Sequence, residues 1–295
     1  MSSTALQRPA AVPAVARRPR RGAAAISRRV LWHAVMIAVA VCAVAPLLYM
    51  VLTSIRPQAT AFSGPIIPDS LTGVGYDFAW NELQIWRNFL NSVLITGTTL
   101  ALTIAAATLA GYAFSRIGFT GRNLLFFVVT SALFLPGVAT LIPVYLELQS
   151  FGLLGSRLGL ILVYTAGGVS FSLFLMRTFF DALPHELSEA ARLDGASEVQ
   201  IFWRVMLPLA APGIATVAIF QMINVWNELL FASALVSDPA NRPIQPVANS
   251  LIGQYATNWP ALTAAMTLSA LPMVIAYVVF QRWFVAGLTA GAVKA

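Results

Sequence analysis

Six apolar runs, each long enough to cross a bilayer, constrain the fold of this chain more than any other feature. A membrane-spanning helix needs about 20 apolar residues, and the runs lie at 31–53, 91–114, 124–146, 158–179, 209–235 and 261–284. The 295 residues are 58% hydrophobic and 10% charged, whereas a soluble domain is about a quarter charged. We therefore predict a polytopic membrane protein, an all-α bundle of six transmembrane helices without a second soluble domain.

The region before the first run predicts a basic tail and no cleaved signal. Residues 1–28 are rich in alanine, proline and arginine, which predicts a disordered cytosolic tail ahead of a transmembrane domain at 29–295. The region resembles twin-arginine and lipoprotein signals. Both are disfavoured, because Pro46 follows the candidate cleavage site and Val41, which is not small, precedes Cys42. We predict that the first span stays attached.

The arginine distribution predicts the topology. Arginines without acidic partners precede the first run, and Arg116 and Arg122 flank the short second connection. Because cytosolic loops carry an excess of Lys and Arg, these segments belong on the cytosolic side. Both termini, including Lys294, are then cytosolic, and the fifth connection at 237–258 lies outside.

Composition also excludes several classes of function. The net charge of +7 comes from flanking arginines that are not interleaved with stacking aromatics, so we expect no nucleic-acid partner. Cys42 is the only cysteine, and His33 and His185 are the only histidines, so we expect no metal site. Lys294 is the only lysine, which leaves no Gly-Lys-Ser/Thr phosphate loop. Any ATP-driven step must use another polypeptide.

The polar stretch between the fourth and fifth runs predicts two short helices joined by a glycine turn. Pro184 suits the start of a helix over 186–193, and Gly195 can reverse the chain because glycine adopts a positive φ at no steric cost. Ser197 and Gln200 predict a capping box for a second helix. Helical spacing predicts that its single apolar face comprises Val199, Phe202, Trp203 and Met206.

This stretch carries a longer pattern: Glu-Ala-Ala, three residues, Gly, nine residues, a β-branched residue, one residue and Leu-Pro. The positions that meet it are Glu189, Ala190, Ala191, Gly195, Val205, Leu207 and Pro208. The pattern resembles the signature of ABC importer permease subunits, and Asp194-Gly195-Ala196 followed by Pro212 resembles its carbohydrate, maltose-type branch. The resemblance implies that a coupling loop at about 181–207 docks in a groove of a separate ATPase. The implied docking residues are Glu189, Ala190, Ala191, Asp194, Gly195, Ala196, Phe202, Arg204, Leu207 and Pro208.

Three polar residues near the end of the fifth run are candidates for a translocation path. Glu228 is the one acid inside a predicted span, and a charge in hydrocarbon usually faces a cavity or a partner. The alternative is that the fifth helix ends earlier and leaves Glu228 near the outer interface. Asn224 and Asn227 either line the path or bond between helices. Pro136 and Pro143 are predicted to break the third run, where we favour a kink that serves packing over a binding site.

The resemblance implies two further contact regions. The loop at 237–258 corresponds to the family's loop that reaches into a solute-binding protein, with a plain polar connection as the alternative. Its candidate contact residues are Asn241, Arg242 and Gln245. The tail at 287–294 is typical of the sugar-permease branch, in which it extends to the ATPase interface, here through Gly291 and Lys294.

The implied assembly resides in the bacterial inner membrane. It contains this chain, a second permease subunit as a heterodimer partner, an ATPase dimer and an extracytoplasmic solute-binding protein. ATP and Mg²⁺ belong to the ATPase, and this chain holds no cofactor. The small-molecule solute is a sugar or oligosaccharide, with glycerol phosphates as the related possibility.

Two other classes of function are weighed against this interpretation. An ion- or proton-coupled secondary transporter requires more intramembrane charge than Glu228, the one acid in the predicted spans. No internal repeat supports this hypothesis either. A non-transporting membrane scaffold is the third hypothesis. Neither requires the Glu-Ala-Ala pattern.

The predicted topology is testable with one introduced cysteine. Asn241→Cys should react with a membrane-impermeant thiol reagent added outside the cell, because residues 237–258 are predicted to be external. Labelling from the cytosolic side alone would invert the topology.

Overall fold

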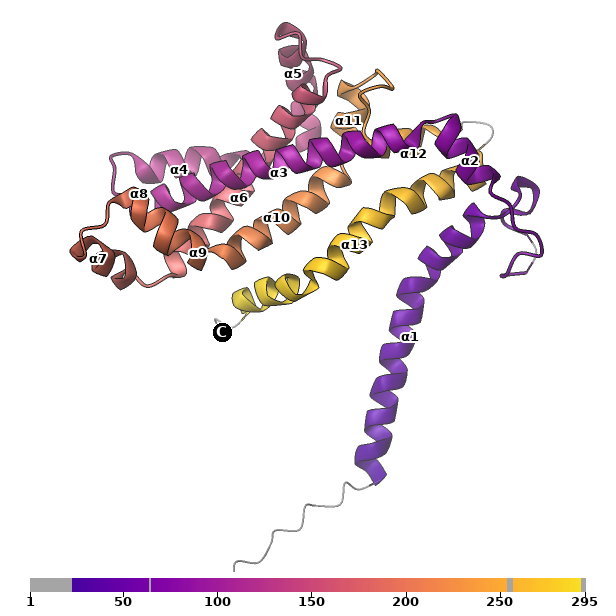
Figure 1. The fold of residues 1–295 in the computed structure, drawn as a ribbon, viewed down its shortest axis with the longest axis horizontal. Coiled ribbons are helices and arrows are strands. Elements are labelled where there is room, and N and C mark those ends of the chain that lie inside the picture. Colours follow the sequence, from indigo (N-terminus) through magenta and orange to yellow (C-terminus); the bar gives the residue numbers. More distant parts are fainter. Residues whose placement is uncertain (1–22, 64, 254–256, 293–295) are drawn as a thin grey trace, which may run out of the picture. The chain divides into compact units, whose positions relative to one another are not determined.

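A computed structural model describes residues 23–63, 65–253 and 257–292, and within these ranges the chain folds into helices and connecting segments without strands. Four helices are long and apolar enough to cross a membrane, and the number rises to six if each of two bent helix pairs is one span. The predicted all-α membrane architecture is confirmed (Figure 1).

The first span forms a unit of its own. Helix α1, Ala23–Ser54, contains Pro46 within its length. It begins inside the segment predicted as disordered tail, so that boundary was placed too late; residues 1–22 lie outside the described part. The chain divides into the units Met1–Tyr49 and Met50–Ala295, and the remaining helices belong to the second.

The second unit is built around the long helices α3, Ile85–Arg116, and α6, Arg157–Ala182. They approach closely at Gly111, where an added Cβ would lie 2.8 Å from the Cβ of Met176. Helices α10, Ala211–Trp226, and α13, Trp259–Ala292, also pack in this unit, with α10 contacting α3, α6 and α13. Figure 1 shows α3 as one uninterrupted helix.

The third apolar run is broken rather than kinked. Helix α4, Arg122–Ser131, continues into the 3₁₀ turn η2, Ala132–Phe134, and then meets α5, Gly137–Ser150, at an angle of 104°. Pro136 precedes α5 in an extended conformation, and Leu135 before it is extended as well. Because proline disfavours a helical conformation at the preceding residue, the chain turns here. The predicted break of this run is therefore confirmed at Pro136, whereas Pro143 lies inside α5 and does not end it.

The fifth run is also divided. Helix α10 ends at Trp226 and a separate helix α11, Leu230–Leu235, follows, so the single span predicted over 209–235 was wrong. The carboxylate of Glu228 accepts hydrogen bonds from the backbone N–H groups of Phe231 and Ala232, at 2.8 and 3.0 Å. A carboxylate near the first turn satisfies N–H groups that have no partner within the helix. Glu228 thus starts a new helix where hydropathy alone predicts continuity.

The first and fifth connections contain structured segments. The first holds η1, Gln58–Thr60, and α2, Val74–Asn81. The connection at 237–258 holds α12, Ile244–Ser250, whose side chains Ile244 and Val247 are buried. This connection therefore contains a packed helix within its described residues.

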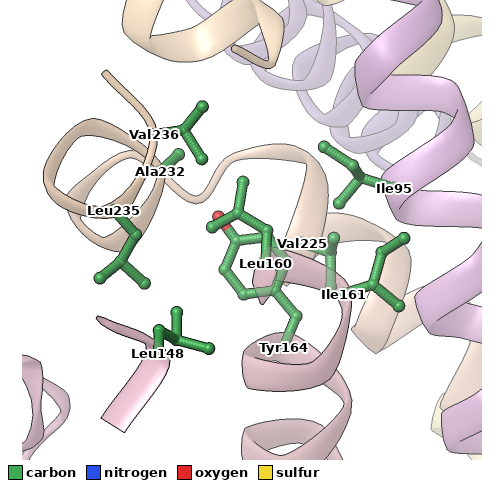
Figure 2. Close-up of a cluster of buried hydrophobic side chains, with 9 residues drawn as sticks. All are labelled: Ile95, Leu148, Leu160, Ile161, Tyr164, Val225, Ala232, Leu235 and Val236. Carbon is green, nitrogen blue, oxygen red and sulfur yellow. The ribbon is translucent and has the colours of Figure 1, made fainter. Parts of the chain in front are cut away.

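Two apolar clusters stabilise opposite ends of the second unit. One gathers side chains of α3, α5, α6 and α11 around Tyr164 (Figure 2). The other joins α3 and α6 to the segment after Gly195; its buried residues are Ala107, Tyr112, Met176, Phe180, Ile201, Phe202, Met206, Ala210 and Val217. The second cluster fixes the predicted coupling loop against the spanning helices.

The close approach at Gly111 makes a prediction about stability. Gly111→Ala should lower the free energy of unfolding by about 1–3 kcal/mol, because the new methyl group would contact Met176 and the backbone nitrogen of Arg177. Gly97→Ala on the same helix is the matched control, since an added Cβ there meets nothing within 4 Å. Thermal unfolding in detergent measures both; equal midpoints would contradict the close packing.

Candidate functional site

The coupling loop folds locally as its sequence predicts. Helix α7, Glu186–Leu193, ends in a turn where Gly195 has a φ of +83°. Helix α8, Glu198–Ile201, follows with a complete capping box between Ser197 and Gln200. A π-helical segment, Phe202–Met206, and α9, Leu207–Leu209, lead into α10 at a bend of 70°. The predicted helix, glycine turn and helix are confirmed.

The predicted apolar face of the second helix is confirmed for two of its four residues and wrong for the other two. Ile201, Phe202 and Met206 are buried, whereas Val199 and Trp203 are 67% and 58% exposed. The buried side chains pack near Tyr112 and Phe180, whose rings contact one another. The ring centroids of Tyr112 and Phe202 lie 5.1 Å apart. Two apolar stripes run along this segment, and tertiary packing decides which of them faces inward.

The docking residues implied by the sequence divide by exposure. Those on the surface are Glu189, Ala190, Asp194, Gly195, Arg204 and Pro208, and those half-buried are Ala191, Ala196 and Leu207. Phe202 is buried against Tyr112, so it anchors the loop rather than lining its surface.

Sequence reasoning missed one of three large apolar side chains that are exposed on the loop. Leu193 is 89% exposed at the end of α7, and Val199 and Trp203 are exposed on the following segment. Exposed large apolar side chains within a polar segment are available for a contact with a partner. Leu193 was detectable in the sequence, because it stands directly before the polar Asp194-Gly195 turn.

An ion pair spans the glycine turn. The Arg192 guanidinium donates a hydrogen bond to the Glu198 carboxylate, with Nε and Oε1 2.6 Å apart. This hydrogen bond raises the pKa of Arg192. The other carboxylate oxygen of Glu198 accepts a hydrogen bond of 3.0 Å from the Tyr112 hydroxyl on α3. The turn is thus connected to a membrane-spanning helix, a connection that the sequence did not indicate.

A second candidate site is a cavity of about 710 Å³ between the broken third span, α6, α10 and α11. Its walls are mainly apolar. The polar side chains among its lining residues are Thr140, Glu147, Tyr164, Gln221, Asn224 and Glu228. Asn227 does not line it; its amide donates to the carbonyl of Ile223 in its own helix. Two of the three predicted path residues therefore share one cavity.

Glu228 is tied into the wall of this cavity. The Tyr164 hydroxyl on α6 donates to its carboxylate at 2.6 Å, in addition to the two backbone N–H groups of α11. Figure 2 shows Tyr164 in one apolar cluster with Val225 of α10 and Ala232 of α11. The Glu228 carboxylate thus joins α6 to α11. The fifth helix does end before Glu228, and Glu228 nonetheless lines a cavity.

The remaining sequence candidates are placed as follows. Asn241 donates to the carbonyl of Gly155, Arg242 to the carbonyl of Val236, and Gln245 to the hydroxyl of Ser269. Position 291 lies in α13, and Lys294 lies outside the described residues. Within the described ranges no group of three or more His, Cys, Asp or Glu side chains is arranged to hold a metal ion.

The chain thus combines a bundle of apolar helices, an exposed polar loop and an open cavity lined by side chains of several helices. The chain belongs to the family described as binding-protein-dependent transport system inner membrane component, which it matches over residues 103–290. Members are transmembrane permease subunits of ABC importers and lack an ATPase site of their own. The family implies an ATPase and a solute-binding protein as partners.

Individual relatives agree with this assignment. The chain is 35% identical over 269 residues to a diacetylchitobiose uptake system permease, NgcG, of Streptomyces coelicolor, covering 89% of this chain and 88% of the relative. It is 33% identical over 263 residues to an arabinooligosaccharides transport system permease, AraQ, of Halalkalibacterium halodurans, covering 87% and 93%. The fold matches a chain in the crystal structure of a bacterial ABC transporter that imports the acidic polysaccharide alginate, with a TM-score of 0.77, 24% identity and coverage of 90% and 100%. A secondary transporter finds no support in these similarities.

The hydrogen bonds of Glu228 predict a large effect of its removal. Glu228→Ala should lower binding-protein-stimulated ATP hydrolysis by the assembled complex at least about tenfold, since it leaves the Tyr164 hydroxyl and the first turn of α11 without their acceptor. Glu147→Ala is the matched control, because it removes a carboxylate from the same cavity without disturbing these bonds. Equal effects of the two substitutions would assign the role to cavity charge alone.

Proposed function

We propose that this permease imports a carbohydrate, in the size range of a disaccharide or oligosaccharide, delivered by an extracytoplasmic binding protein. The observation that carries the proposal is its similarity over nearly the whole chain to permeases named for diacetylchitobiose and arabinooligosaccharides. A mainly apolar cavity with a few polar side chains is compatible with a sugar, which presents both apolar faces and hydroxyl groups. Glycerol phosphates are the alternative class of solute, and the uptake experiment compares them with oligosaccharides.

The proposed assembly contains a second permease subunit as heterodimer partner and two copies of an ATPase, which bind ATP and Mg²⁺. Both termini lie in the cytosol of a bacterial cell, the coupling loop faces the ATPase, and the segment at 237–258 faces the binding protein through Asn241, Arg242 and Gln245. The tail, with Gly291 and Lys294, reaches toward the ATPase interface.

The exposed part of the coupling loop is the proposed ATPase-docking surface. Glu189 and Asp194 supply charge, and the apolar side chains Leu193, Val199 and Trp203 supply area that would be buried on docking. The positive φ of Gly195 sets the angle between the two helices, so the loop moves as a unit. Asn224, Asn227 and Glu228 remain the proposed path residues, the first and last of them in the cavity.

The proposal predicts that Gly195 is essential for docking. Gly195→Val should weaken ATPase association and abolish uptake while the chain still reaches the membrane. A β-branched residue at a φ of +83° is strained by about 1–3 kcal/mol, which is small against the insertion of apolar helices and large against one groove contact. Gly195→Asn is the control, because asparagine tolerates this backbone region. Glu189→Ala should act as Gly195→Val does, more mildly.

The measurement combines pull-down of the ATPase with uptake in the same membranes. Radiolabelled diacetylchitobiose and arabinooligosaccharides are the solute probes, and glycerol 3-phosphate is the comparison. Normal association and uptake with Gly195→Val would contradict the docking role. Import of glycerol 3-phosphate without import of any oligosaccharide would contradict the carbohydrate assignment.

A further inference from the structure

Helix α3 is attached at both ends to segments that the proposed function places against different partners. At its C-terminal end lies the coupling loop, and at its N-terminal end lies the segment at 237–243 of the external connection. Asn88 and Tyr112, which make the two attachments, are separated by 24 residues of continuous helix, or about 36 Å at 1.5 Å per residue. That length exceeds the roughly 30 Å hydrocarbon core of a bilayer.

The inner attachment is made by Tyr112. Its side chain is only 4% exposed, and its ring packs edge-on against Phe180 and at a tilt against Phe202. Its hydroxyl reaches out of this apolar cluster to donate to Glu198, which also binds Arg192 across the glycine turn. An exposed ion pair alone contributes little. Because Glu198 also accepts the hydrogen bond of the buried Tyr112, the angle between α7 and α8 depends on the position of α3.

The outer attachment is made by two asparagines. The Asn88 amide donates to the carbonyls of Pro239 and Arg242, at 3.2 and 2.9 Å. The Asn91 amide donates to the carbonyls of Ala240 and Arg242, at 2.9 and 3.0 Å. Both asparagines are buried, at 2% and 3% exposure. Four hydrogen bonds therefore hold the backbone at 239–242 to the end of α3.

A fifth hydrogen bond extends this attachment. The hydroxyl of Ser92, the residue after Asn91 in α3, accepts the backbone N–H of Ile244 at 2.9 Å, at the start of α12. The segment at 237–243 is thus held in a fixed position against α3, and a displacement of either one must move the other or break several buried hydrogen bonds. Buried polar groups that lose their partners are costly, so movement together is favoured.

We propose that α3 transmits movement directly between the external segment at 237–243 and the coupling loop, with Tyr112 and the Asn88–Asn91 pair as positioning residues at its two ends. The proposal depends on the proposed function, which places the binding protein at one end and the ATPase at the other. A continuous helix carries a displacement along its axis with little loss, whereas the two bent spans turn by 104° between Phe134 and Gly137 and by 70° between Leu209 and Ala211.

The test measures how strongly the binding protein stimulates ATP hydrolysis by the purified complete complex. Tyr112→Phe should leave ATPase association and basal hydrolysis unchanged and lower the stimulated-to-basal ratio about tenfold, the scale of one hydrogen bond to a charged group. Asn88→Ala should lower the same ratio. Tyr76→Phe is the matched control, because it removes a hydroxyl that bonds to Ser54 at 2.9 Å and takes no part in the hydrogen bonds of either attachment.

The decisive measurement is the double variant. Residues about 36 Å apart that act independently have additive effects on free energy. If α3 is the shared route, Tyr112→Phe combined with Asn88→Ala should lower the ratio no further than the stronger single variant. Multiplied effects, or an unchanged ratio for Tyr112→Phe, would overturn the proposal. If Tyr112→Phe fails to assemble, Glu198→Gln, which breaks the ion pair with Arg192, replaces it with the same expected direction. Failure of the ATPase to co-purify with the unaltered chain would instead contradict the proposed function.

Discussion

The core of a bilayer offers no water, so each backbone N–H and C=O group must find its hydrogen-bond partner within the protein. The rest of this structure depends on that constraint. The protein meets it with long helices and supplies substitute partners wherever a helix stops. Glu228 provides acceptors for the first N–H groups of α11 where α10 has ended. The break before α5 falls at Pro136, which has no N–H to satisfy. Each interruption therefore occurs where a side chain reduces its cost, and two of them border the same cavity.

Polar side chains also link the helices to one another. Gln221 of α10 donates to the carbonyl of Gly168 and to the hydroxyl of Ser172, and an added Cβ at Gly168 would lie 2.5 Å from the Gln221 side chain. The indole of Trp226 donates to the carbonyl of Ser269 in α13. In apolar surroundings such bonds specify which faces meet, because apolar packing alone does not distinguish a helix from the lipid. They give the bundle a defined arrangement around its cavity.

The coupling loop combines an anchored side with an exposed side. Phe202 and Met206 fix it to α3 and α6, while Leu193, Val199 and Trp203 are left for a partner. A contact that must transmit force requires both properties. It needs an exposed surface that a partner can bind and a firm attachment to the membrane-spanning helices. The Gly195 turn and the Arg192–Glu198 pair keep the two short helices at a fixed angle between these two sides.

The sequence by itself determined the membrane class, the helical character, the Gly195 turn and the capping box at Ser197, because hydropathy, backbone sterics and capping are local properties. The Glu-Ala-Ala pattern also predicted which loop docks on the ATPase, and that role stays a prediction. Only the tertiary structure decided that α10 ends at Trp226, that Phe202 faces inward while Trp203 faces outward, and that Tyr112 binds Glu198. These outcomes depend on which distant groups come within hydrogen-bonding or packing distance. Residues 86 positions apart, such as Tyr112 and Glu198, leave no periodicity in the sequence that records their contact.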